Sequence, residues 1–150
     1  MKKWAQKQKG FTIVELLIVV VVIAILAAIT IVSFNGIQTR ARDSARDVAV
    51  KNIQTALEMY KEDNNGVYPN ACGSPNTGCN VPNLASALVP KYMSTVPNDP
   101  SSGVNIGYVV SIGQTGYSLN VKYESKPACK IFAGQNYVTS WWGSGVPACS

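Results

Sequence analysis

The fold is decided by the stretch Phe11-Thr-Ile-Val-Glu-Leu-Leu-Ile-Val-Val-Val-Val-Ile-Ala-Ile-Leu-Ala-Ala-Ile-Thr-Ile-Val32. Nineteen of its 22 residues are apolar. As an α-helix it would be about 33 Å long, close to the ~30 Å hydrocarbon core of a membrane. Lipid offers the backbone no hydrogen-bonding partners, so such a segment forms a helix even when many residues are β-branched. The 150-residue sequence contains one run of this kind, so we do not expect several membrane spans.

A short basic segment precedes this run. It contains no acid and four lysines, at Lys2, Lys3, Lys7 and Lys9. Positive residues beside a span favour the cytoplasmic side, so we expect a cytoplasmic N-terminus with the rest of the chain outside. Residues 11–150 carry 9 Lys and Arg against 8 Asp and Glu. The net charge of +5 is therefore mostly a topology signal, and it does not favour nucleic acid as a partner.

Glu15 is the one charged residue inside the apolar stretch. A carboxylate within a membrane span is costly and is by default functional, with a partner to be named. A plain signal-anchor helix gives Glu15 no role. A cleaved secretory signal gives it none either, and its apolar region would be shorter, about 7–15 residues.

Residues 9–17 resemble the prepilin-peptidase motif of type IV pilins and their pseudopilin relatives. The motif combines a basic leader, Gly10 before Phe11, Glu15 at the fifth position of the mature chain, and a following apolar helix. The resemblance implies that a prepilin peptidase cuts after Gly10 and that the new N-terminal residue, Phe11, is N-methylated. It also implies that Glu15 meets the positive amine of a neighbouring subunit. Such a pair fixes register better than it adds stability.

The same resemblance implies an α+β fold of lollipop shape, with a long N-terminal helix packed on a small antiparallel β-sheet head. We expect a cleaved basic leader at 1–10 and a transmembrane or filament-core half of the helix at 11–32. An amphipathic half of the helix at 33–65 and a globular, disulfide-stapled β head at 66–150 would follow.

The amphipathic half is predicted from apolar residues that recur mostly at three- and four-residue steps. They are Phe34, Ile37, Ala41, Ala45, Val48, Ile53, Ala56, Leu57 and Tyr60. We expect this stripe to pack on one face of the sheet. The charged residues between them, from Arg40 to Asp47, are expected to form a solvated, mutually neutralising face. Asp63-Asn64-Asn65-Gly66 predicts the helix end.

In the head, Pro, Gly and Asn predict a loop over 69–83, and a short helix is expected at Leu84–Val89 with Asn83 as its cap. Apolar residues then alternate with other residues over 106–113 and 117–124. The intervening turn, 114–116, predicts a β-hairpin. A third strand is predicted at 130–133 and a fourth at 137–140.

Four cysteines, Cys72, Cys79, Cys129 and Cys149, permit three disulfide pairings. A location outside the cell favours disulfides, and the lack of a C-x2-C pair argues against zinc. We prefer Cys72–Cys79 with Cys129–Cys149, since each pair closes a local loop. A C-terminal disulfide-bounded region also resembles the one seen in many pilins.

Catalytic chemistry has no support in the sequence, which lacks His, a Gly-rich phosphate loop and a nucleophile elbow. We therefore expect no enzyme activity, no cofactor and no resident metal. A calcium site near Asp99 stays open by analogy with some pseudopilins. Trp141 and Trp142 form either an adhesive or base-stacking patch or, as we favour, part of the core.

These features predict a structural subunit of a type IV pilus, built from copies of this chain through helix packing. Its partners would be the prepilin peptidase and the pilus assembly machinery. It would be a single-pass membrane protein before assembly and part of an extracellular pilus, for motility or adhesion, afterwards. Two alternatives stay open: a pseudopilin of a type II secretion or DNA-uptake system, and an uncleaved, membrane-anchored extracellular binding domain.

Overall fold

The computed structural model describes residues 10–101 and 106–149, so the four leader lysines lie outside the described residues. The helices and strands follow one another along the chain in a fixed order. They are α1 (Ile13–Asp63), β1 (Cys79–Asn80), the 3-10 helix η1 (Val81–Leu84), α2 (Ala85–Leu88), β2 (Gly107–Val110), the 3-10 turn η2 (Ile112–Gln114), β3 (Gly116–Val121) and β4 (Cys129–Gly134). The chain divides into two units, Met1–Gln38 and Thr39–Ser150.

Helix α1 ends where the Asn-Gly sequence predicts. The N–H of Gly66 donates to the carbonyl of Lys61 at 2.9 Å. Asn65 and Gly66 both have positive φ, 56° and 79°. A left-handed residue that turns the chain back onto the last carbonyls is a common way to end a helix. The predicted end of the long helix is confirmed.

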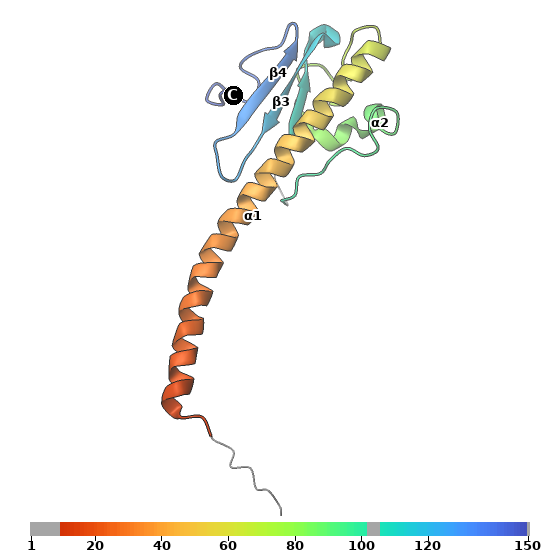
Figure 1. The fold of residues 1–150 in the computed structure, drawn as a ribbon. Coiled ribbons are helices and arrows are strands. Elements are labelled where there is room, and N and C mark those ends of the chain that lie inside the picture. The colour runs from red at the N-terminus through yellow and green to blue at the C-terminus, as the bar shows by residue number, and fades with distance from the viewer. Residues whose placement is uncertain (1–9, 102–105, 150) are drawn as a thin grey trace, which may run out of the picture. The chain divides into compact units, whose positions relative to one another are not determined.

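The head contains a four-stranded antiparallel sheet in the order β1-β2-β3-β4. Figure 1 shows β3 and β4 as neighbouring arrows beside the second half of α1. Strands β2 and β3 form the predicted hairpin, with Val110 opposite Tyr117 next to the turn. Strand β4 corresponds to the predicted third strand. The α+β class, a long N-terminal helix with a small antiparallel sheet, is confirmed.

The prediction of a strand at 137–140 is wrong. The carbonyls of Thr139 and Trp141 accept hydrogen bonds from the ammonium of Lys130, at 2.7 and 3.4 Å, so this segment turns around a side chain. The fourth strand is instead β1, inside the predicted loop, where Cys79 lies opposite Tyr108.

The predicted short helix is present, but its cap is not Asn83. Asn83 lies inside η1, which precedes α2. Pro82 stands in the first turn of η1, where its fixed φ favours a helical start. The helical segment therefore begins several residues earlier than the sequence pattern predicts.

The head's core lies between the second half of α1 and one face of the sheet. Helix α1 contributes the buried residues Val50, Ile53, Ala56 and Leu57 to this core. The sheet contributes Tyr108, Val110, Tyr117, Leu119 and Val121. The ring of Tyr68, which follows the helix end, lies 4.7 Å from that of Tyr117. Strands β2 and β3 are buried on both faces, so the sheet is covered on its other side too.

The prediction of a packed apolar stripe on α1 is wrong for the residues before Val50. Ala41, Ala45 and Val48 are exposed, while Asp43 and Arg46 are buried. The expectation of a fully solvated charged face is therefore also wrong. Asp43 and Arg46 can be buried because side chains of the head, such as Asp99 and Ser125, bind their charged groups.

Candidate functional site

The start of α1 is built around Thr12 and Glu15. The Thr12 N–H and the Thr12 hydroxyl both donate to Oε2 of Glu15, each at 2.8 Å. In return, the Glu15 N–H donates to the Thr12 hydroxyl at 3.2 Å. This reciprocal arrangement is a capping box, which satisfies N–H groups that a helix start leaves without partners.

The helix that follows presents its apolar side chains outward. Every described side chain from Phe11 to Ile31 is exposed, with Phe11 at 89% and Ile13 at 85%. Among the described residues, α1 is the one helix long and apolar enough to cross a membrane. A surface of this kind requires lipid or other protein chains around it.

The capping box leaves Glu15 with capacity for another donor. Both hydrogen bonds from Thr12 end on Oε2, and within the described residues Oε1 accepts none. An ionised carboxylate offers about four acceptor positions. Gly10 and Phe11, the residues on either side of the expected cleavage point, are both exposed. Gly10 and Phe11, between which cleavage is expected, are thus exposed close to a carboxylate that can accept a cationic donor.

A second polar cluster ties α1 to two loops of the head. The guanidinium of Arg46 is fully buried and donates to both carboxylate oxygens of Asp99 at 2.7 Å. It also donates to Asp43 at 2.6 Å, to Glu124 at 2.7 Å and to the hydroxyl of Ser101 at 2.9 Å. Charge-assisted and bidentate pairs of this type are among the stronger hydrogen bonds in proteins.

Hydrogen bonds keep two acids of this cluster, Asp43 and Glu124, ionised. Burial raises the pKa of Asp43, but hydrogen bonds from the Ser125 side chain, two backbone N–H groups and Arg46 outweigh it and lower the pKa to about 2. Hydrogen bonds from Arg42, Ser101 and Arg46 lower the pKa of Glu124 to about 2. Asp43 and Glu124 therefore stay negatively charged throughout the neutral range.

The same contacts occupy the carboxylate near which a calcium site was considered, that of Asp99. Both Asp99 oxygens are bound by Arg46, and the N–H of Ser101 donates to Oδ1 at 2.8 Å. The described residues contain no group of three metal-ligating side chains. The guanidinium already supplies the positive charge that a calcium ion would bring to this loop.

The four cysteines form two disulfides, Cys72–Cys79 and Cys129–Cys149. The second disulfide closes a loop that is organised around Lys130. The buried Lys130 ammonium donates to three backbone carbonyls of that loop, those of Thr139, Trp141 and Gly143. The C-terminal loop is thereby held by a covalent bond and an internal cation.

Trp142 covers the outer face of the sheet. Its ring lies so close to Gly78 and Gly107 that a Cβ at either position would come within 2.8 and 2.6 Å of it. Glycine at both positions is therefore required for this packing. Trp141 and Trp142 are half-buried and do not belong to the core cluster in which they were expected from the sequence.

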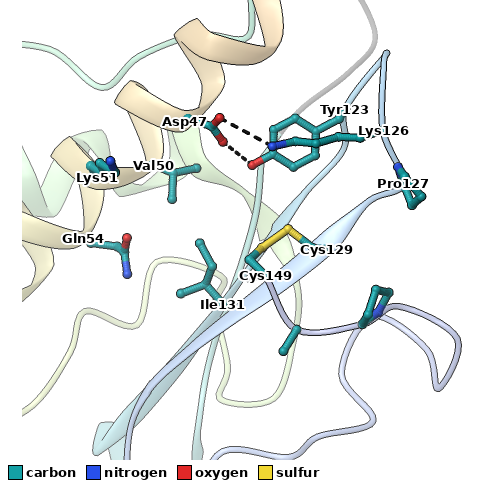
Figure 2. Close-up of a pocket in the computed structure, with 12 residues that line it drawn as sticks. Asp47, Val50, Lys51, Gln54, Tyr123, Lys126, Pro127, Cys129, Ile131 and Cys149 are labelled. Atoms are coloured by element: carbon teal, nitrogen blue, oxygen red, sulfur yellow. Dashed lines mark hydrogen bonds and ion pairs between the residues drawn. A yellow bond between two sulfur atoms is a disulfide. The ribbon is translucent and has the colours of Figure 1, made fainter.

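A groove of about 500 Å³ lies between α1 and the C-terminal disulfide (Figure 2). Its apolar part includes Val50, Ile131 and the Cys129–Cys149 disulfide. Its lining also includes Lys51 of α1 and Lys126 of the β3–β4 loop. The remaining residues that line it are Asp47, Gln54, Tyr123, Pro127, Pro147 and Ala148.

Three side chains on one side of this groove, those of Asp47, Tyr123 and Lys126, contact one another. The hydroxyl of Tyr123 donates to Asp47, and the Lys126 ammonium lies 3.6 Å from the other oxygen of that carboxylate. The same ammonium lies 3.9 Å from the centre of the Tyr123 ring. Figure 2 shows the Lys126 side chain beside this ring, with Asp47 facing both.

Sequence reasoning missed three functional or organising residues. Thr12 was detectable, since Thr-x-x-Glu before an apolar run is the capping-box pattern. The roles of Arg46 and Lys130 depend on partners brought together by the fold. For them the sequence offers no local signal.

Comparison with known proteins identifies the N-terminal region independently. Residues 5–31 match the family model "Prokaryotic N-terminal methylation motif". The chain is 30% identical over 115 residues to the type II secretion system core protein G of Aeromonas hydrophila, covering 74% of this chain and 78% of that protein.

Two pilus proteins are also similar. The type IV wide pilus major component PilA4 of Thermus thermophilus is 37% identical over 90 residues, covering 56% of this chain and 69% of that protein. The type IV major pilin protein PilE1 of Neisseria gonorrhoeae is 32% identical over 89 residues, covering 59% of this chain and 39% of that protein. No solved structure matches the chain.

The similarity extends beyond the methylation motif into the helix and the head, and the fold has the long helix and small antiparallel sheet that the motif implies. The chain therefore belongs to the type IV pilin and pseudopilin family, and it is a structural subunit rather than an enzyme.

Proposed function

We propose that the chain is the structural subunit of a type IV pilus filament. The observation that carries this proposal is the position of Glu15, a carboxylate at the start of a helix whose apolar side chains are all exposed from Ile13 to Ile31. In the membrane precursor, the capping box gives this carboxylate two donors from Thr12. In the filament, Oε1 of Glu15 accepts a hydrogen bond from the N-terminal amine of a neighbouring subunit.

Processing creates that amine. A prepilin peptidase removes residues 1–10 by cutting after Gly10, and the new N-terminal Phe11 is then N-methylated. The apolar helices leave lipid and pack against one another, so the hydrophobic free energy changes little. Because apolar helices can slide along each other, the ionic contact of Glu15 fixes their register.

The four segments have separate roles in this proposal. Residues 1–10 hold the precursor in the correct orientation, with the N-terminus in the cytoplasm. Residues 11–32 form first the membrane span and later the filament core. Residues 33–65 connect this core to the head at 66–150, which faces outside. The partners are copies of the chain, the prepilin peptidase and the pilus assembly machinery.

A pseudopilin of a type II secretion system is the second candidate. It is favoured by the similarity to core protein G, which covers more of this chain than the similarity to PilA4 does. Filaments sheared from the cell surface and composed mainly of this chain would support the pilus. A loss of protein secretion on deletion, without surface filaments in the parent strain, would support the pseudopilin.

Replacement of Glu15 tests the assembly mechanism. We expect Glu15→Ala to insert in the membrane and to be cleaved after Gly10, because neither step uses the carboxylate contact. It should fail to enter filaments, whereas an Asp63→Asn control, which removes an exposed acid outside the apolar half of α1 and keeps Glu15, should assemble normally. Normal filaments from Glu15→Ala would contradict the mechanism.

A further inference from the structure

We propose that the groove in Figure 2 binds the end of α1 from a second copy, with Met59 entering the groove and Glu62 pairing with Lys126 at its rim. The inference rests on the proposed function, because it assigns a contact between neighbouring subunits. It concerns the heads and is separate from the packing of the apolar helices.

The groove has the size and chemistry to bind an apolar side chain that has an acidic side chain next to it. Its volume of about 500 Å³ is within the range of pockets that bind ligands. Ile131 and the Cys129–Cys149 disulfide offer half-buried apolar contact, while Lys51 and Lys126 are exposed. The one acid that lines the groove, Asp47, is already bound by Tyr123 and Lys126. An incoming acid would therefore meet lysines rather than an unpaired carboxylate.

The end of α1 carries a matching surface. Met59 is 48% exposed, and Glu62 is exposed three residues later. Residues at this spacing lie on the same side of a helix. Methionine is flexible and adapts to irregular apolar grooves.

Glu62 is also the acid with a free carboxylate at this end of α1. Glu58 accepts from Tyr68 at 2.8 Å and lies 3.5 Å from Lys61, and Asp63 lies 2.8 Å from Lys91. Within the described residues, by contrast, the carboxylate of Glu62 makes no hydrogen bond or ion pair. The negative charge of Glu62 complements the positive charge of Lys126. We therefore infer that the end of α1 is the part of a second copy that binds in the groove.

The two surfaces lie at different levels of the helix. Met59 follows Val50 by nine residues, which is about 14 Å along an α-helix. It does not line the groove of its own chain. A contact between two different surfaces of identical chains repeats from copy to copy and builds an open filament when it does not close into a ring. A contact between the groove of one copy and the end of α1 of the next can therefore repeat along a filament.

Photocrosslinking in filaments tests the contact directly. Full-length chain with benzoylphenylalanine in place of Met59 would be expressed in the cells that assemble it, and sheared filaments would be irradiated and analysed by mass spectrometry. We expect crosslinks to residues 47–54 or 127–131 of a second copy. Crosslinks to other surfaces, such as the turn at the 72%-exposed Ile112, would overturn the inference, as would intact filaments without crosslinks.

Charge reversal gives an independent readout. Glu62→Lys should lower the filament yield about fivefold, through repulsion from Lys126. The double variant Glu62→Lys/Lys126→Glu should restore at least half of the yield, which a merely structural effect would not do. Lys122→Glu, which changes an exposed lysine outside the groove, is the charge-matched control when combined with Glu62→Lys and should not rescue. Equal rescue by both, or normal filaments from Glu62→Lys alone, would overturn the inference.

The two proposals fail differently. If the unaltered chain forms no filaments, the proposed pilus function is wrong and the groove contact falls with it. If filaments form but neither the crosslink nor the charge rescue is found, the groove contact alone is wrong.

Discussion

The guanidinium of Arg46 holds both oxygens of the Asp99 carboxylate at 2.7 Å, although 53 residues separate the two along the chain. This pair joins the long helix to the loop that precedes β2. Because Arg46 also binds Asp43 and Glu124, one side chain connects the helix to two loops of the head. The head's attachment to its own helix therefore depends on a buried ionic cluster as well as on an apolar core.

Removal of Arg46 should strongly destabilise the head. Arg46→Ala leaves the buried acids Asp43 and Asp99 without their cation, and breaking a buried pair in this way costs about 3–5 kcal/mol. The unfolding free energy of the detergent-solubilised chain, followed by circular dichroism in urea, measures the change. Arg42→Ala is the control, since Arg42 is about one-third exposed and binds Glu124 at the edge of the cluster. Equal losses for both variants would contradict the special role of Arg46.

The stability of the head should fall in acid. The folded-state pKa values of Asp43 and Glu124 are about 2, below the values of about 4 in an unfolded chain. Their stabilising contribution is complete above about pH 4 and is lost as the pH falls towards 2. We expect a flat Tm from pH 8 to 5 and a decline from pH 4 to 2.

A variant of Asp43 separates this effect from general acid denaturation. Asp43→Asn removes one of the groups that titrate, so its Tm should be lower at pH 7 but should decline less between pH 4 and 2. A decline as steep as that of the unaltered chain would show that Asp43 does not contribute to the pH dependence.

Calcium should have no effect on the folded head. Asp99, the residue at which a calcium site was considered, has both oxygens bound to Arg46. A ligand that binds only the native state raises Tm by mass action, so EDTA would lower Tm if the head held calcium. We expect identical melting curves in EDTA and in millimolar calcium chloride. A Tm that falls in EDTA and recovers with calcium would refute this.

Thr12 should matter for assembly through the capping box. Thr12→Ala removes the hydroxyl that both donates to Glu15 and accepts from its N–H, a loss of about 1 kcal/mol at the helix start. We expect fewer filaments from Thr12→Ala at equal membrane levels of the precursor. Thr12→Ser, which keeps the hydroxyl, should assemble normally. Equal filament yields from the two variants would show that the hydroxyl is not needed.

The features predicted well from the sequence are those encoded by neighbouring residues. The apolar helix, its end at Asn65-Gly66 and the β2–β3 hairpin each follow from a local pattern of hydrophobicity or turn residues. The N-terminal motif is local as well, which is why residues 9–17 were sufficient to indicate the family that the comparisons show.

The features predicted poorly depend on contacts between distant segments. Arg46 looked like a solvated residue because its acidic partners Asp99 and Glu124 come from loops more than 50 positions away. The segment 137–140 looked like a strand because its pattern does not reveal that Lys130 binds its carbonyls. Tertiary partners decide both outcomes.

The most direct test of the account is the mass of the N-terminal peptide of this chain in filaments sheared from the cell surface. We predict a peptide that begins at an N-methylated Phe11 and lacks residues 1–10. A peptide that retains Met1 to Gly10 would contradict the account, because an uncleaved chain has no amine at Phe11 for the neighbouring Glu15 to bind.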